Sequence, residues 1–397
     1  MASQNKGWYA ACGILFLCLY AVELAFIFSI TPDPCEDAYI TFRYSKNLAE
    51  GNGPVFNPGE RVEGYSNPLW MTGIAAASLL GLDMATFSRA AGALFNGLSL
   101  LLVWFIPRRW FGMRGAASLM GPLMYLLFLP FQFYAASGLE TSFYTFLITC
   151  GAAAMIWAGT RPRRVALGCA VLLLASLTRP EGVMFFLFYC AWIAGCRIVK
   201  QQPLKPFVPG LLLFAAGYGA FLLWRLGYYG LPLPNTYYVK GSFPLYVRSF
   251  IGYFVNKSFF TNYPWFLVLL PFFLFVKIGD ARRTAPLYVC IAAGLVFSLF
   301  FSGWDWMPYF RYNVPVVPLM LVCFQLMAFE LWRRARPTGR GRALWLGAFA
   351  CLLLEAGEQY WKDLAFNYRW RELGEIARYN QRTLGEWIGR ELGKKPV

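Results

Sequence analysis

The chain has 397 residues, of which 58% are hydrophobic and only 14% are charged. Soluble domains are roughly 45–50% apolar and about 25% charged, so this composition excludes an ordinary soluble protein and indicates a membrane protein with several spans. The formal net charge is +16. Because the basic residues gather in short loops between apolar stretches, membrane topology explains them better than nucleic-acid binding, and we expect no nucleic-acid partner.

The sequence contains no histidine. This excludes Ser-His-Asp and Cys-His triads, histidine-ligated zinc or haem, and imidazole bases. Proton transfer must therefore use Asp, Glu, Lys, Tyr or Cys, and an oxygen-bound metal would be a hard cation such as Mg²⁺, Mn²⁺ or Ca²⁺.

Apolar runs recur along most of the chain. They lie near residues 8–30, 86–106, 115–135, 141–158, 165–178, 183–196, 206–226, 263–278, 284–302, 313–332 and 343–360. Since a helix needs roughly 20 apolar residues to cross a bilayer, they predict an all-α polytopic bundle of about 11 transmembrane helices. The apolar stretch Pro68–Leu82 is short for a span, and we expect it to lie in the membrane interface.

The loop charges predict the orientation of the chain. Alternate loops carry groups of Arg and Lys, near residues 108–114, 161–164, 197–205, 277–283 and 333–342. The positive-inside rule places these loops and the N-terminus in the cytoplasm. The opposite loops, including the first outer loop at 31–85, carry most of the acidic residues. We therefore expect a transmembrane module over 1–360 with an extracytoplasmic working face, followed by an amphipathic extracytoplasmic tail over 361–397.

The first outer loop opens with the sequence DPCED at 33–37. This order predicts a helix start, with Asp33 as the N-cap and Glu36 as its capping-box partner. The apolar residues that follow share one face, which predicts an amphipathic helix lying on the membrane: Ile40, Tyr44 and Leu48.

Acidic residues directly after a membrane span lie where a lipid-linked substrate presents its head group. Asp37 is therefore the candidate catalytic base, with Glu36 beside it in the catalytic pair. The same two carboxylates are the candidate ligands of a divalent cation. The alternatives are structural, because Glu36 can close a capping box and Asp37 can simply stabilise a helix end.

Further charged and polar residues lie in short outer loops between apolar spans. Four cations are candidates for binding a donor phosphate: Arg43, Arg179, Lys240 and Arg311. Five residues are candidates for substrate binding: Glu140, Glu181, Asn235, Tyr237 and Asp305. The alternative is interhelical salt bridges, such as Arg179 with Glu181 or Glu140.

The string EDAYITFRYSKNLAEGNGPVFNPGERVEGYSNPLW at 36–70 resembles the first outer loop of bacterial GT-C glycosyltransferases close to the mycobacterial terminal arabinofuranosyltransferases. The later pieces GLET, LTRPEG, YYGLPLPNTYYVK and DWMP-x-x-R follow in the order of that group, over roughly residues 30–390. The family's Asp-Asp pair falls on Glu36 and Asp37. The family's Gly-Gly-Asp corresponds to the sequence SGWD at 302–305, and this shift weakens the assignment of a role to Asp305.

The resemblance implies a GT-C bundle with juxtamembrane helices in the first outer loop, in a bacterial cytoplasmic membrane. It implies an inverting transfer, with Asp37 as general base, from a polyprenyl-phosphate sugar to a glycan or protein hydroxyl on the outer face. D-arabinofuranose is the favoured sugar. No cofactor is required, and a divalent cation at the acidic pair stays an open option. Because similar enzymes continue into an extracytoplasmic domain, we expect acceptor recognition to be reduced or different.

Two other functions remain open on the residues alone. A membrane carrier or flippase of lipid-linked sugars would bury its polar residues near the membrane midplane and show paired helix breaks. An O-antigen-type ligase would also act on polyprenyl-linked glycans at the outer face. An outer-loop arginine would then be essential, and Asp37 would be dispensable.

Overall fold

The computed structural model describes residues 4–31, 33–159, 161–241, 257–263, 281–300, 307, 309–335, 343, 346–347 and 349–366. Every regular element in this part of the chain is a helix, and the residues at 349–366 are helical as well. The elements are α1 (Gln4–Ile30), α2 (Glu36–Ala49), α3 (Pro68–Leu79), α4 (Met84–Phe111), η1 (Gly115–Leu119), α5 (Met120–Leu126), α6 (Leu129–Ala136), α7 (Thr141–Ala158), α8 (Pro162–Thr178), α9 (Gly182–Val199), η2 (Lys205–Phe207), α10 (Val208–Tyr229), α11 (Asn235–Gly241), α14 (Ala281–Phe300), η4 (Val314–Val316) and α15 (Val317–Ala335).

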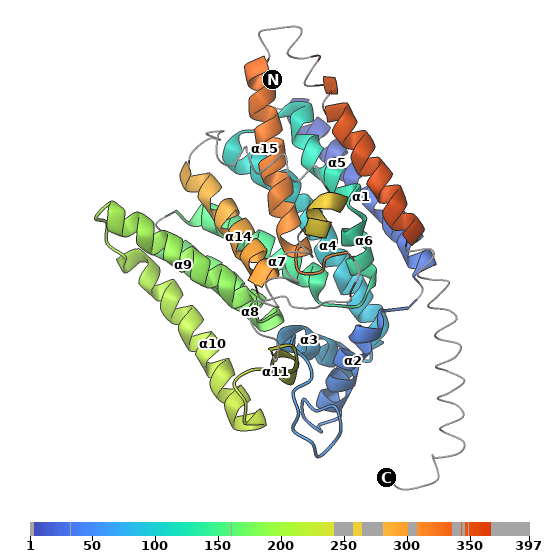
Figure 1. The fold of residues 1–397 in the computed structure, drawn as a ribbon, viewed down its shortest axis with the longest axis vertical. Helices are drawn as coiled ribbons and strands as arrows, with labels where there is room; N and C mark the ends of the chain where they lie inside the picture. The colour runs from blue at the N-terminus through green and yellow to red at the C-terminus, as the bar shows by residue number, and fades with distance from the viewer. Residues whose placement is uncertain are drawn as a thin grey trace.

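The fold is an all-α membrane bundle, as the sequence predicts (Figure 1). Within the described residues, seven helices are long and apolar enough to cross a membrane, namely α1, α4, α7, α9, α10, α14 and α15 together with η4. The count of about 11 spans is not confirmed. Helix α8 has only 17 residues, the run near 263–278 lies almost wholly outside the described residues, and the run near 343–360 is described only in part.

The run near 115–135 is not one straight helix. It forms the segments Ala117–Leu126 and Leu129–Ala136, which meet at an angle of 53°. Pro130 lies in the first turn of α6, where it has no N–H to continue the preceding helix, so a new helix begins there. Counted as one bent span, this pair raises the number of candidate spans to eight.

Among the seven candidate spans of the described residues, α7 and α15 are the most buried, whereas α1, α9 and α10 expose most of their length. Helix α4 packs against α6, α7 and α15, and α8 packs against α7, α9 and α10. The approach of α4 to α6 is close, because a Cβ added at Gly92 would lie 2.5 Å from the carbonyl oxygen of Ala135. Helices α9 and α10 form one edge of the bundle, where they join at one end and diverge toward the other (Figure 1).

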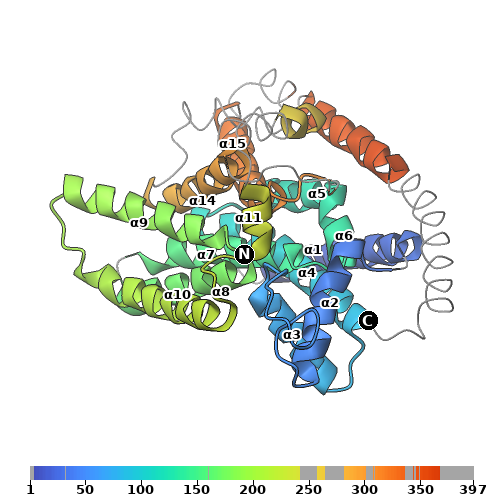
Figure 2. The same ribbon diagram turned by 60° about the horizontal axis from the view of Figure 1, so that its bottom comes forward.

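Helices α2 and α3 pack together at one end of the bundle (Figure 2). The predicted apolar stripe of α2 is only partly buried, because Ile40 is 42% exposed. Tyr44 and the partly buried Leu48 pack in a cluster with Tyr65 and Met71, and Ile40 faces a cavity. The predicted short helix at Pro68–Leu82 is present as α3.

The predicted N-cap of α2 is wrong. The helix begins at Glu36, and the capping position belongs to Cys35, which makes no side-chain cap. The N–H of Cys35 instead donates to the carbonyl oxygen of Ser137 at 2.9 Å. Gly138 follows with a left-handed φ of +79°, and a Cβ there would lie 3.0 Å from Pro34. This tertiary contact fixes the extended chain before α2, so no capping box forms.

Candidate active site

A cavity of about 870 Å³ lies where α2, the segment 64–67, the start of α7, the α8–α9 turn and the segment before α15 meet. One part of its wall is charged and polar, and includes Asp37, Thr41, Asn67, Glu140, Arg179, Glu181, Arg311 and Tyr312. The other part is apolar and comes mainly from α9, α10 and α14: Val183, Met184, Leu187, Phe188, Leu222 and Phe297. The cavity therefore suits a ligand with one charged and one apolar end.

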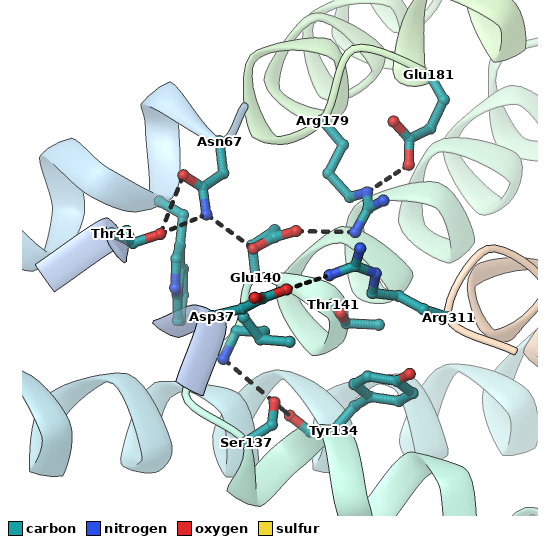
Figure 3. Close-up of polar contacts among 12 residues, drawn as sticks. Asp37, Thr41, Asn67, Tyr134, Ser137, Glu140, Thr141, Arg179, Glu181 and Arg311 are labelled. Carbon is teal, nitrogen blue, oxygen red and sulfur yellow. Dashed lines mark hydrogen bonds and ion pairs between the residues drawn. The ribbon is translucent and has the colours of Figure 1, made fainter. Parts of the chain in front are cut away.

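Five ionisable residues of this wall form what we call the charged centre: Asp37, Glu140, Arg179, Glu181 and Arg311 (Figure 3). All five were candidate site residues from the sequence, and they come from four separate segments of the chain. The fold thus brings together residues that the sequence singled out one by one.

Arg179 is the buried hub of the charged centre. It is the C-cap of α8, where the chain turns extended before the short link to α9. Its Nη1 contacts Glu140 Oε1 at 2.8 Å, and its Nε donates to Glu181. Burial alone would lower the pKa of this guanidinium, but Glu181 and Glu140 raise it above its ordinary value. Arg179 is therefore charged and fully engaged, as the salt-bridge alternative predicted.

Glu140 is held from both sides. Its Oε1 binds Arg179, and its Oε2 accepts a hydrogen bond of 2.8 Å from Asn67 Nδ2. Asn67 also donates to the hydroxyl of Thr41 at 3.1 Å. Asn67 thereby ties the first outer loop and α2 to the start of α7 (Figure 3).

Asp37 and Arg311 form a looser pair. The distance from Arg311 Nη1 to Asp37 Oδ2 is 3.5 Å, and the side chains are 11% and 29% exposed, respectively. The side chains of the other two carboxylates, Glu140 and Glu181, are 6% and 9% exposed. Asp37 is therefore the most accessible of the three carboxylates that line the cavity, and the one best able to accept a proton from a ligand.

The remaining candidates lie elsewhere or cannot be placed. Glu36 is exposed and does not line the cavity, because neighbouring residues on a helix point about 100° apart. Arg43 is exposed as well, and its Nε donates to the carbonyl oxygen of Phe56 at 3.0 Å. The side chain of Lys240 and the whole of Asp305 lie outside the described residues.

The segment after α10 contributes to the wall. Tyr237 lines the cavity, whereas the backbone N–H of Asn235 donates to the carbonyl oxygen of Glu63 at 3.0 Å. Asn235 therefore positions this segment and is not among the residues that line the cavity.

The proposed metal pair does not fit a metal site. Glu36 and Asp37 are turned apart, and in the described part of the chain no three His, Cys, Asp or Glu residues are grouped to hold an ion. No step is therefore assigned to a metal.

A buried ion pair that the candidate residues did not include fastens one wall of the cavity. Arg225 of α10 contacts Glu63 Oε2 through Nε at 3.1 Å, and both side chains are at most 2% exposed. Arg225 also donates to the carbonyl oxygen of Pro232 at 3.3 Å. Burial raises the pKa of Glu63, while Arg225 acts in the opposite direction. The sequence does show Arg225 inside an apolar run, and a charged residue in such a run indicates a buried partner, so this pair could have been suspected from the sequence.

Comparison with known proteins gives the fold and two distant relatives. No family model matches the chain. The chain superposes on the crystal structure of ArnT from Cupriavidus metallidurans bound to undecaprenyl phosphate with a TM-score of 0.59. The superposition covers 99% of this chain and 81% of ArnT, at 15% sequence identity. The apo form of ArnT gives a TM-score of 0.58 at 17% identity, covering 85% of this chain and 62% of that one. The protein has the ArnT-like GT-C fold.

Two curated relatives share part of the sequence. A terminal β-(1→2)-arabinofuranosyltransferase of Mycobacterium tuberculosis is 27% identical over 234 residues, which is 52% of this chain and 34% of the relative. The enzyme of the same name from Corynebacterium glutamicum is 26% identical over 236 residues, covering 52% of this chain and 33% of the relative. The matched region thus spans about a third of each relative. The predicted resemblance to this group is confirmed over about half of the chain.

Proposed function

We propose that the protein is an inverting membrane glycosyltransferase that moves a sugar, with D-arabinofuranose favoured, from a polyprenyl-phosphate donor to a hydroxyl of a glycan or protein. The observation that carries this proposal is the accessible Asp37–Arg311 pair at the edge of a cavity with one charged and one apolar side. The arabinofuranosyltransferase relatives support the sugar. The undecaprenyl phosphate bound to ArnT supports the lipid.

The apolar part of the cavity suits the lipid end of the donor. Val183, Leu187 and Leu222 lead from the charged centre along α9 and α10. On the outer surface of α10, Leu223 is 73% exposed and Trp224 is 44% exposed. Leu187 of α9 both lines the cavity and is 55% exposed, so a polyprenyl chain can run from the cavity along this apolar surface into the surrounding lipid.

The charged centre suits the phosphate end. Arg179 is already neutralised by Glu140 and Glu181, so Arg311 is the cation of the centre best placed to take a new anion. A donor phosphate that binds Arg311 competes with Asp37 for the guanidinium. Donor binding thus weakens the Asp37–Arg311 contact and leaves the Asp37 carboxylate available as a base.

The transfer then follows a single displacement. Asp37 accepts the proton of the acceptor hydroxyl as its oxygen forms a bond to the anomeric carbon. The bond from that carbon to the phosphate oxygen breaks on the opposite face, and its electron pair stays on the polyprenyl phosphate. Arg311 stabilises the charge that develops there. Attack opposite the leaving group inverts the anomeric configuration.

The test is donor turnover in proteoliposomes, using polyprenyl-phosphoryl arabinofuranose and a mixed glycan acceptor. Product and free polyprenyl phosphate should appear, and Asp37→Asn should lower turnover by about 10²–10⁴-fold without loss of donor binding. Glu36→Gln is the matched control, since it removes the neighbouring exposed carboxylate, and it should retain activity.

Near-normal turnover of Asp37→Asn would remove Asp37 as the base and favour an O-antigen-type ligase. Turnover only with another polyprenyl-phosphate sugar would keep the enzyme and change the donor. Lipid movement between leaflets without any product would favour the carrier.

A further inference from the structure

Arg311 is carried by a segment with an unusual backbone. The two residues before it are both in the left-handed region, with φ values of +63° for Tyr309 and +54° for Phe310. Large side chains avoid this region because of steric contacts with their own backbone. Two such residues in a row persist only where their surroundings hold them, and such conformations concentrate at functional sites.

Tyr309 is held by the helical residues at 349–366. Its hydroxyl donates to the backbone carbonyl oxygen of Asp363 at 2.9 Å. Its ring packs edge-on against Phe133 of α6, with centroids 5.0 Å apart, and against Phe366 at 5.9 Å. Tyr309 is only 8% exposed.

Phe310 is held by the helical residues at 349–366 indirectly, through Tyr263. Its ring packs edge-on against those of Phe259 and Tyr263. The hydroxyl of Tyr263 donates to Asp363 Oδ2 at 2.7 Å, and Gln359 Nε2 donates to the other carboxylate oxygen at 2.9 Å. Asp363 therefore supports both left-handed residues, one through its backbone carbonyl and one through its side chain.

The segment is fixed on its far side as well. The carbonyl oxygen of Phe310 accepts the N–H of Asn313 at 2.8 Å, and the side chain of Asn313 accepts a hydrogen bond from Ser298 of α14 at 3.0 Å. Arg311 lies between these two attachments. Its side-chain direction is thus set by the backbone on both sides.

We propose that Asp363 is a positioning residue for Arg311, acting through Tyr309 and Tyr263 to hold the left-handed pair that aims the guanidinium at Asp37. Asp363 is not among the residues that line the cavity. This inference rests on the proposed role of Arg311 in binding the donor phosphate. It also assigns a task to the helical residues at 349–366, which connects the last described part of the chain to the charged centre.

The experiment uses three single variants of the full chain, together with Arg311→Ala alone and combined with Tyr309→Phe. Tyr309→Phe removes one hydroxyl, and Asp363→Asn keeps the shape of the side chain while changing its charge. The matched control is Glu358→Gln, which removes an exposed carboxylate of the same helix whose partner is the exposed Lys362. Hydrogen–deuterium exchange over residues 309–313 reports the segment directly. Binding of undecaprenyl phosphate to the protein in nanodiscs reports its effect on the site.

We expect faster exchange over 309–313 in Tyr309→Phe and Asp363→Asn, but not in Glu358→Gln. Undecaprenyl phosphate should bind about fivefold more weakly to Tyr309→Phe, the equivalent of one lost hydrogen bond. This loss should disappear when Tyr309→Phe is combined with Arg311→Ala, because both changes act through the same guanidinium.

Unchanged exchange in both variants would overturn the inference, as would losses of binding that simply add in the double variant. Failure of the wild-type protein to bind undecaprenyl phosphate would count against the proposed function instead. The exchange measurement would then still decide whether Asp363 holds the segment.

Discussion

The ionisable residues of the charged centre differ in how fully they are engaged. Arg179 makes two close ion pairs and is buried, whereas the ion pair between Arg311 and the more accessible Asp37 is longer, at 3.5 Å. The sequence made both arginines candidate phosphate ligands, and gave a salt bridge with Glu181 or Glu140 as the alternative for Arg179. We propose on the basis of these ion pairs that Arg179 is a structural cation and that Arg311 is the cation that binds a ligand.

Removing the two arginines should therefore have different effects. Arg179→Met would leave Glu140 and Glu181 buried without a counter-charge, and breaking such a pair costs about 3–5 kcal/mol. Arg311→Ala should weaken donor binding by about tenfold or more, with little change in stability. Thermal unfolding and donor-lipid binding, measured on the same preparations, check both. A stable Arg179→Met protein with weakened donor binding would reverse the assignment.

Asp363 gives a prediction for pH. It lies past the predicted last span, and burial raises its pKa to about 6, while hydrogen bonds from Tyr263 and Gln359 lower it. The Asp363 carboxyl therefore binds its proton more tightly in the folded state than in the unfolded state, where it has its ordinary pKa of about 4. Protonation of Asp363 therefore stabilises the folded state fully at a pH below about 4. This contribution to the free energy of unfolding, about 3 kcal/mol at most, is lost as the pH rises through about 6.

Asp363→Asn should remove this dependence. The unfolding temperature of the wild-type protein should decline between pH 4.5 and 7 relative to that of the variant, whereas Glu358→Gln should follow the wild type. Parallel curves for Asp363→Asn and the wild type would show that the carboxyl does not titrate in this range.

At the scale of elements, the contact between α4 and α6 positions the start of α7. Because a Cβ at Gly92 would meet the backbone of Ala135, Gly92→Ala should destabilise the protein by about 1–3 kcal/mol. It should also lower activity, since α6 leads into Ser137 and Glu140. Gly73→Ala in α3 is the control, because nothing lies within 4 Å of the added Cβ. Gly73→Ala should raise the free energy of unfolding by up to about 1 kcal/mol. Equal changes in stability for Gly92→Ala and Gly73→Ala would argue against the close contact between α4 and α6.

The sequence allows the helices to be predicted better than their number or their ends. Long apolar runs mark α1, α4 and α10 directly. The break between α5 and α6, and the shortness of α8, depend on single residues that a hydropathy pattern averages out. The start of α2 depends on the bond from Cys35 to Ser137, a contact between distant segments that no local capping pattern contains.

The same limit applies to the site. The charged residues of the centre could be singled out because charge is rare beside apolar spans. Asn67 could not, since an asparagine in a polar loop carries no such signal, and its role depends on where the fold brings Glu140. Glu63 and Arg225 are likewise far apart in the sequence, so their pairing required the structure.

At the scale of the whole molecule, the charge distribution predicts which face carries the cavity. Glu60 lies in the acidic loop that is predicted to be the first outer loop, and Arg163 lies in the first turn of α8, within a basic group predicted to be cytoplasmic. A cysteine introduced as Glu60→Cys should react with a membrane-impermeant maleimide on intact cells. Arg163→Cys should react only after permeabilisation. The unsubstituted protein, with its ten cysteines, gives the baseline, and the reverse pattern would place the charged centre in the cytoplasm.

The apolar side of the cavity, formed by α9, α10 and α14, has a consequence for kinetics. A donor whose tail stays in the bilayer reaches the charged centre by diffusion in two dimensions. Its effective concentration is then its mole fraction among the lipids of the membrane, and the volume of the suspension is irrelevant. Diluting the donor with inert phospholipid should therefore slow the reaction, whereas diluting the vesicles with buffer should leave the rate per vesicle unchanged at constant acceptor concentration.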